Sequence, residues 1–342
     1  MRNACTILID RPAIHTRGCP INLRTLAFFL LIGAVLVGCR RFEAAPTTIP
    51  TVSPTPRSTP LPALPTSAPL GSEANPLQMV VVSSDATMLD EPVAALETAL
   101  TDATGISVRV IVVATPALAL QSLCDSPEGA VSAAWLEGLS ALAAQAQGCG
   151  DFSLAIARTI DERTTTTASI QMIAARSAPS ISALADRRFC RVSLTDLETW
   201  LYPSILLEST GFDIARSIPR IDNYATALEV AETVARGTTC QAAGVSSATL
   251  AALDEDVRER LTLVQPTLSV PYGLLTYPEQ VSLHVRTLLD NALLGLSADD
   301  EQGALITTVL GADALRPFSN ADLESLRSAL TTAGLDPGQI GR

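Results

Sequence analysis

The chain has 342 residues, of which 47% are hydrophobic and 17% are charged, a composition typical of a folded globular protein. Its formal net charge is −12 at pH 7, and all 23 basic residues are arginines. Nucleic acids and anionic membrane surfaces bind basic patches, so this acidic balance argues against nucleic acid as a partner.

The N-terminal segment has the pattern of an export signal. Residues 1–24 carry four arginines against one aspartate, and the uncharged apolar run at 25–38 is shorter than the ~20 residues that span a bilayer. The run ends in LVGC, residues 36–39, which resembles a bacterial lipobox. We therefore expect residues 1–38 to be a lipoprotein signal peptide and Cys39 to carry the lipid. The alternative is an uncleaved anchor, and both place the rest of the chain outside the cytoplasmic membrane.

Residues 39–76 are expected to form the lipidated cysteine and a disordered tether. The segment from 40 to 76 holds nine of the 22 prolines and few large apolar residues, so it cannot bury a core. Because four arginines and one aspartate precede Cys39, the exported part is more acidic than the whole chain, at −15.

The first part of the body alternates short β-branched runs with helical stretches. Strands are predicted at 77–83, 107–114, 129–135, 152–159 and 168–176, and helices at 90–105, 116–124 and 137–148. Asp90 is the expected N-cap of the first helix, and Gly105 stands just beyond its end. This alternation predicts an α/β structure with a mainly parallel sheet covered on both faces.

A second series follows along the chain. Strands are predicted at 189–193 and 260–266, and helices at 195–209, 224–237, 276–296, 297–311 and 319–334. The stretches QAAGVSS (241–247) and VPYGLLTY (270–277) complete the series. The body of about 260 residues exceeds what one hydrophobic core usually fills, so two α/β lobes are expected.

Four cysteines remain after Cys39, namely Cys124, Cys149, Cys190 and Cys240. An even number in an oxidising compartment predicts two disulfides, although four cysteines allow three pairings. We favour Cys124–Cys149 and Cys190–Cys240, because each pair then lies within one lobe. No CxxC spacing is present and His284 is the only histidine after the leader, so no metal site is predicted.

Three stretches carry a resemblance to a known family. They are NPLQMVVVSSDA (75–86), ALQSLCDSPEGAVSAAWLEGLSALAAQAQGC (119–149) and SALADRRFCRVSLTDLETWLYPSILLES (182–209). In order and spacing they resemble the solute-binding lipoproteins of ABC importers, in particular the phosphate, phosphite and phosphonate type. The resemblance runs from residue 77 to about 334.

The resemblance implies a type II periplasmic-binding fold with a ligand cleft between two lobes. Residues 77–168 and 267–342 would form lobe 1, and residues 169–266 lobe 2, with crossings near 164–168 and 264–272. It also implies a monomer without a cofactor, held by its lipid on the extracytoplasmic face of the cell membrane, which delivers a small solute to ABC permease subunits.

An enzyme is the main rival class. The sequence lacks GxSxG, P-loop, HExxH and glycine-rich dinucleotide motifs, and the exported part has one histidine and no lysine. We therefore expect no enzymatic activity. A second rival is a sensory or structural ligand-binding lipoprotein with a degenerate cleft and no transport role.

Candidate ligand contacts lie at strand ends and at helix starts. Ser83, Ser84 and Asp85 follow the first strand at the carboxyl edge where α/β proteins bind ligands, but they would also make a good turn. Trp135 ends a strand at the same edge and would either line the cleft or cover the core. The remaining candidates are Thr195, Asp196, Glu198, Thr199, Asn223, Tyr224, Ser246 and Tyr272.

The turn at residues 195–199 departs from the family pattern. Phosphonate-binding members have a Thr/Ser/Gly-rich turn there, whose backbone N–H groups hold the oxyanion, whereas this chain has Asp196 and Glu198. One carboxylate within ~5 Å of a bound anion would cost roughly 3 kcal/mol at an effective dielectric of 20. The ligand is then a neutral solute, a cation or zwitterion, or an oxyanion in another register. Alternatively, both acids simply cap the helix.

Overall fold

The computed structural model describes residues 68–83, 86–126, 130–175 and 180–339. The expected signal peptide, Cys39 and most of the expected tether therefore lie outside the described residues. Across the described ranges, no helix combines the length and apolar character needed to cross a membrane.

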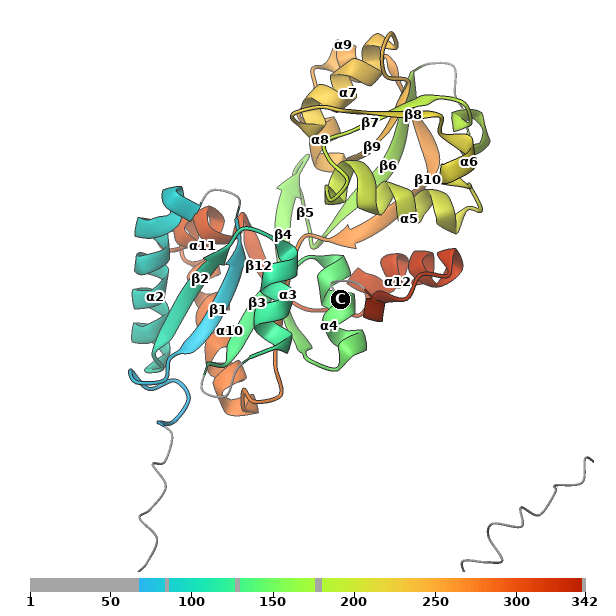
Figure 1. The fold of residues 1–342 in the computed structure, drawn as a ribbon. Coiled ribbons are helices and arrows are strands. Elements are labelled where there is room, and N and C mark those ends of the chain that lie inside the picture. The colour runs from blue at the N-terminus through green and yellow to red at the C-terminus, as the bar shows by residue number, and fades with distance from the viewer. Residues whose placement is uncertain (1–67, 84–85, 127–129, 176–179, 340–342) are drawn as a thin grey trace, which may run out of the picture. The chain divides into compact units, whose positions relative to one another are not determined.

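Two β-sheets, each flanked by helices, form the body, which confirms the predicted α/β class (Figure 1). The first sheet has the order β12-β4-β11-β3-β1-β2, with β5 paired to β4, and the second has the order β10-β6-β9-β7-β8. The strands of the first sheet are β1 (Leu77–Val82), β2 (Val108–Val113), β3 (Ser132–Leu136), β4 (Asp151–Ile160), β5 (Arg163–Thr165), β11 (Leu274–Tyr277) and β12 (Ala314–Pro317). Those of the second sheet are β6 (Thr167–Ala175), β7 (Arg188–Arg191), β8 (Arg220–Asn223), β9 (Ala242–Ser246) and β10 (Leu261–Pro271).

Along the chain, most helices come between two strands of the same sheet, and they pack against that sheet. The longer ones in the first part and at the C-terminal end are α2 (Asp90–Thr104), α3 (Pro116–Cys124), α4 (Gly138–Gln147), α10 (Leu283–Ala298), α11 (Gly303–Leu310) and α12 (Ala321–Ala333). Those between β7 and β10 are the π-helix η3 (Leu197–Leu201), α5 (Tyr202–Ser209), α6 (Ile214–Ser217), α7 (Ala227–Arg236), α8 (Ser247–Ala251) and α9 (Glu255–Arg258). Short 3₁₀ turns are η1 (Ala86–Leu89), η2 (Ile181–Leu184) and η4 (Pro337–Gln339). The last long helix, α12, packs against β10 and α5, so it contacts elements of the second sheet.

Strand direction differs from the mainly parallel pairing predicted for the sheets. Parallel pairs occur between β1 and β2, β1 and β3, β7 and β8, and β7 and β9. The other pairs are antiparallel, so both sheets are mixed. The reason is the chain crossing: β6 enters the second sheet and β10 leaves it, so these neighbours run in opposite directions, and the same holds for β4 and β11 in the first sheet.

Several predicted helix starts need correction, among them that of 297–311, since residues 297–298 belong to α10 and the next helix begins at Gly303. The helix predicted from Asp90 does begin there, but its N-cap is Leu89, because η1 leads directly into α2. Gly105 ends this helix with a φ of 69°, a left-handed conformation that glycine adopts without strain. The helix predicted from residue 276 begins at Leu283, since Thr276 belongs to β11, and Ser282 caps it by accepting from Val285 N at 3.4 Å.

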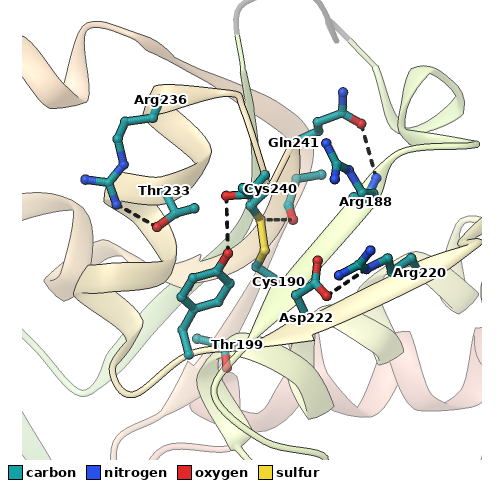
Figure 2. Close-up of a disulfide and its surroundings, with 12 residues drawn as sticks. Arg188, Cys190, Thr199, Arg220, Asp222, Thr233, Arg236, Cys240 and Gln241 are labelled. Carbon is teal, nitrogen blue, oxygen red and sulfur yellow. Dashed lines mark hydrogen bonds and ion pairs between the residues drawn. A yellow bond between two sulfur atoms is a disulfide. The ribbon is translucent and has the colours of Figure 1, made fainter.

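Both favoured disulfides are present. Cys124 and Cys149 have Cα atoms 5.0 Å apart, and Cys190 and Cys240 have theirs 5.9 Å apart. The second bridge joins β7 to the segment before β9 (Figure 2). It is buried in a core cluster that includes Val234. The first bridge joins the end of α3 to the segment after α4, so each half of the body contains one bridge.

Candidate functional site

Two adjoining cavities lie at the strand ends, and we call them together the cleft. One has a volume of about 240 Å³ and the other about 180 Å³, and both are lined by Glu137, Arg158, Leu197 and Tyr272. The larger is further lined by Ala168, Ile170, Glu198, Tyr202, Ser246 and Thr249. The smaller, which we call the first-sheet cavity, is further lined by Val81, Val82, Pro116, Trp135, Ile156 and Leu310. Larger hollows elsewhere, beside α3 and beside α5 and η4, are not at the carboxyl ends of strands.

Glu137 links β3 to the start of α4. Its Oε1 accepts from Ser140 N at 2.8 Å and its Oε2 from Leu139 N at 2.6 Å, so the carboxylate caps the helix. The Tyr202 hydroxyl also donates to Oε2, at 2.7 Å. The positive end of α4 therefore already faces a carboxylate.

Tyr202 is a buried donor within the cleft, with only 4% of its surface exposed. Burial raises the pKa of its hydroxyl well above the ordinary value, and the negative charge and hydrogen bond of Glu137 raise it further. The phenol therefore remains protonated, and donates to Glu137, at every physiological pH.

Acidic and hydroxyl side chains also cap the helices of the second sheet. Asp196 accepts from Thr199 N at 2.6 Å and from Thr199 Oγ1 at 2.5 Å, at the start of η3. Glu198 accepts from Ser246 N at 2.9 Å and from the Thr249 hydroxyl. Ser246 in turn accepts from Thr249 N at 3.1 Å, at the start of α8.

Three helix starts at the cleft, those of α4, η3 and α8, are thus bonded to side chains of the chain itself. A free helix start attracts anions because its N–H groups are unsatisfied and its dipole end is positive. Here a carboxylate or hydroxyl oxygen accepts from at least one of those N–H groups at each of the three starts. A multiply charged anion would have to displace these side chains or approach them at a Coulomb cost.

Arg158 is the cation that faces both cavities. It lies on β4, its Nε donates to Gly311 O at 2.9 Å, and its guanidinium carbon lies 4.8 Å from the centre of the Tyr272 ring. The ion pairs in the described part of the chain involve other arginines. Its charge is therefore available to a ligand in the cleft.

Two further donors at the first-sheet cavity lack partners. Trp135 is 4% exposed, and its Nε1 has no hydrogen-bond partner among the described residues. The Tyr272 hydroxyl is likewise buried and unpartnered within those ranges. Buried polar groups are normally satisfied, so two such donors beside one cavity indicate a place for an acceptor.

Of the candidates predicted from sequence, Trp135, Glu198, Ser246 and Tyr272 line the cleft. Ser83, Thr195, Asp196 and Thr199 are not among the lining residues, and Ser84 and Asp85 lie outside the described residues. Thr199 is 1% exposed and accepts from Val192 N at 2.9 Å, so it serves the helix start.

Asn223 and Tyr224 also lie away from both cavities. Asn223 is exposed and accepts from Arg191 Nε at 3.0 Å. Tyr224 packs on the core cluster around the Cys190–Cys240 disulfide, with its hydroxyl 3.3 Å from Thr239 Oγ1.

Sequence reasoning missed Glu137, Arg158 and Tyr202. Glu137 directly follows a strand, at the same edge that suggested Trp135, so the same rule could have found it. Arg158 is a charge in the apolar strand β4 with no conspicuous neighbours in sequence. Nothing in the local sequence of Tyr202 indicates that it meets Glu137, which lies 65 residues earlier.

The body has two mixed β-sheets flanked by helices, with a cleft at strand ends of both. This is the fold of type II periplasmic binding proteins. Residues 79–323 match the profile of the periplasmic substrate-binding protein of phosphonate ABC transporters, so the chain belongs to that family. Proteins of this family bind small solutes, work with ABC permease subunits and are not enzymes.

Solved structures with the same fold are distant in sequence. A binding protein of an ABC phosphonate transporter from Pseudomonas aeruginosa is 14% identical, with a TM-score of 0.53 over 75% of this chain and 87% of that chain. A Xanthomonas citri protein bound to chloride ion is 13% identical, with a TM-score of 0.58 over 76% and 97%. PhnD1 from Prochlorococcus marinus, in complex with methylphosphonate, is 14% identical, with a TM-score of 0.53 over 75% and 98%. No curated protein matches the chain.

Proposed function

We propose that the chain is the lipid-anchored, extracytoplasmic solute-binding protein of an ABC transporter. The observation that carries this proposal is the cleft itself, which is lined from β3 and β4 of the first sheet and from β6 and α8 of the second. It combines apolar walls with a few polar groups, Arg158 and Tyr272 among them, as small-molecule sites do. Family membership supplies the transport context.

Capture would proceed by closure of the two lobes around the solute, by hinge motion at the crossing strands. The two crossings are adjacent, since Tyr272 N donates to Thr166 O at 3.1 Å. Solute that contacts both lobes favours the closed state, because a ligand shifts an equilibrium only by its differential affinity.

The lipid anchor rests on the sequence pattern at residues 36–39. A proline-rich tether of this length reaches on the order of 100 Å at ~3.1 Å per residue, which keeps the receptor near its permease. Metabolic labelling with a radioactive fatty acid tests the anchor: the full chain should be labelled in a bacterial host, and a Cys39→Ala variant should not. Equal labelling of both would refute it.

The ligand is proposed to differ from the phosphonate that PhnD1 from Prochlorococcus marinus holds. Carboxylates cap the starts of α4 and η3, and a third carboxylate bonds at the start of α8, where a phosphonate would compete with them. We therefore infer that the family's oxyanion turn is not retained.

Thermal melting of the full chain tests solute binding. The panel would hold phosphate, methylphosphonate, sulfonates, amines, amino acids and monocarboxylates. A ligand at 100 times its Kd adds about 2.7 kcal/mol to the free energy of unfolding, which is on the order of 5 °C for a body of this size. No shift with any class at millimolar concentration would contradict the proposal.

A sensory or structural lipoprotein is the second candidate, and the capped helix starts favour it because they depart from the family's ligand geometry. Deletion of the gene in its host distinguishes the two. Loss of uptake of a solute that shifts the melting temperature supports the transporter, whereas unchanged uptake supports the second candidate.

A further inference from the structure

Three of the side chains that line the first-sheet cavity carry hydrogen-bond donors. The donors are the Arg158 guanidinium, the Trp135 Nε1–H and the Tyr272 hydroxyl, the last two being buried without partners among the described residues. Glu137 is the acidic side chain that lines this cavity, and its carboxylate already accepts from two backbone N–H groups and from Tyr202. A ligand here must therefore bring acceptors.

The rest of the cavity wall is apolar. Val81 and Val82 at the end of β1, Ile156 on β4 and Leu310 at the end of α11 line it, together with Pro116. Proline at the first position of α3 also offers no N–H group to a ligand. Burial of a hydrocarbon group against these side chains is favourable, whereas burial of a polar one is not. With a volume of about 180 Å³, the cavity suits a ligand with few non-hydrogen atoms.

The charged side chains around the cavity restrict the class of ligand further. Arg158 supplies one positive charge, while Glu137 borders the same cavity and Glu198 borders the adjoining one. A dianion meets twice the attraction and twice the repulsions that a monoanion meets, and it loses more hydration on burial, so of the two the monoanion fits better. The planar guanidinium fork matches the planar carboxylate, with two parallel N–H···O bonds.

We propose that the first-sheet cavity binds a small monocarboxylate with a short apolar body, its carboxylate on Arg158 and its hydrocarbon against Val81, Ile156 and Leu310. Trp135 Nε1–H and the Tyr272 hydroxyl donate to the remaining acceptor positions. This assignment rests on the proposed solute-binding function and names its ligand class.

Tryptophan fluorescence gives a direct readout of this cavity. Trp135 and Trp200 are the only tryptophans of the chain, and Trp200 lies under the Arg191 guanidinium, 4.5 Å away. A Trp200→Phe variant of the full chain leaves Trp135 as the single reporter. Pentanoate is the probe, with pentanamide, pentylamine and methylphosphonate as comparators of equal or smaller size.

Pentanoate should change the emission of Trp135 in a saturable way, and the comparators should bind at least about tenfold more weakly, since a charge-assisted bidentate pair is lost or mismatched. Arg158→Gln should weaken pentanoate at least about tenfold, and Arg163→Gln, an exposed charge on β5, should leave it unchanged. Tyr272→Phe removes only a hydroxyl that has no partner in the described part of the chain, so it should fold normally and weaken binding several-fold.

The outcomes separate this assignment from the proposed function. If methylphosphonate or pentylamine binds and pentanoate does not, or if Arg158→Gln and Tyr272→Phe both bind pentanoate as tightly as the parent, the ligand class is wrong while solute binding stands. If no compound changes the emission or the melting temperature at millimolar concentration, both proposals fail.

Discussion

The Tyr202–Glu137 hydrogen bond joins α5, which belongs to the second sheet, to the N-terminus of α4, which belongs to the first, and its removal gives a defined loss of stability. Tyr202→Phe deletes the hydroxyl and keeps the ring. Glu137 would retain its bonds from Leu139 N and Ser140 N, so no buried group is left unpaired. Hydrogen bonds to charged groups contribute about 1.5–3 kcal/mol, and the lower half of that range applies here.

We therefore expect the variant to lose about 2 kcal/mol and to melt about 4 °C lower, at about 2 °C per kcal/mol for a large domain. Differential scanning calorimetry of the full chain at pH 7 measures this loss. Tyr224→Phe is the matched control, because its hydroxyl lies 3.3 Å from Thr239 Oγ1 near the surface, away from any charged group in that contact. It should change the melting temperature by less than about 1 °C. If the two variants have the same melting temperature, Tyr202 does not donate a hydrogen bond to Glu137.

The same pair predicts a response to alkaline pH. The pKa of Tyr202 is raised in the folded protein, so the folded state holds this proton more tightly than the unfolded state, whose tyrosine pKa is about 10. Stability from this group is complete below pH ~10 and falls as pH rises above it. The melting temperature of Tyr202→Phe should fall less steeply over that interval, and equal slopes would contradict the assignment.

Four further variants test the fold. Replacing Cys190 and Cys240 by alanine opens a loop of 50 residues, for which chain entropy predicts a loss of about 4 kcal/mol, measurable by urea unfolding. Burial raises the pKa of Asp290, so the stability that this group contributes falls as pH rises above the ordinary carboxyl pKa of about 3.9. In Asp290→Asn the melting temperature should therefore depend less on pH across the weakly acidic range. An unchanged slope of melting temperature against pH would contradict this. Gly244→Ala would place a Cβ 1.9 Å from a proline ring of α5 and should cost at least about 3 kcal/mol, whereas Gly295→Ala, with open space in α10, should be neutral or stabilising by circular-dichroism melting.

Much of the fold follows from local sequence signals. The α3 helix has the bounds that the sequence predicts, because Thr115 and Pro116 mark its start and the apolar positions continue to Cys124. The antiparallel pairs could not be predicted, because alternating strands and helices indicate parallel pairing. The antiparallel pairs arise from chain crossings such as β6 with β10, which only the tertiary structure defines.

The site was less predictable than the fold. Rules about strand ends found Trp135 and could equally have found Glu137. They could not show that Glu137 accepts a hydrogen bond from Tyr202, which comes from another part of the chain. The sequence predicts two alternative roles for the acids of the turn at 195–199, as ligand contacts or as helix caps. The structure shows Asp196 capping η3 and Glu198 reaching 48 residues along the chain to Ser246, a contact that no local pattern contains.

The side-chain caps at the starts of α4, η3 and α8 also bear on competition among solutes. Inorganic phosphate binds most readily where backbone N–H groups converge without a partner, and at these three positions Glu137, Asp196 and Ser246 already accept from such groups. Ambient phosphate would therefore be a poor competitor, and the cleft would remain open to its own solute in phosphate-rich surroundings.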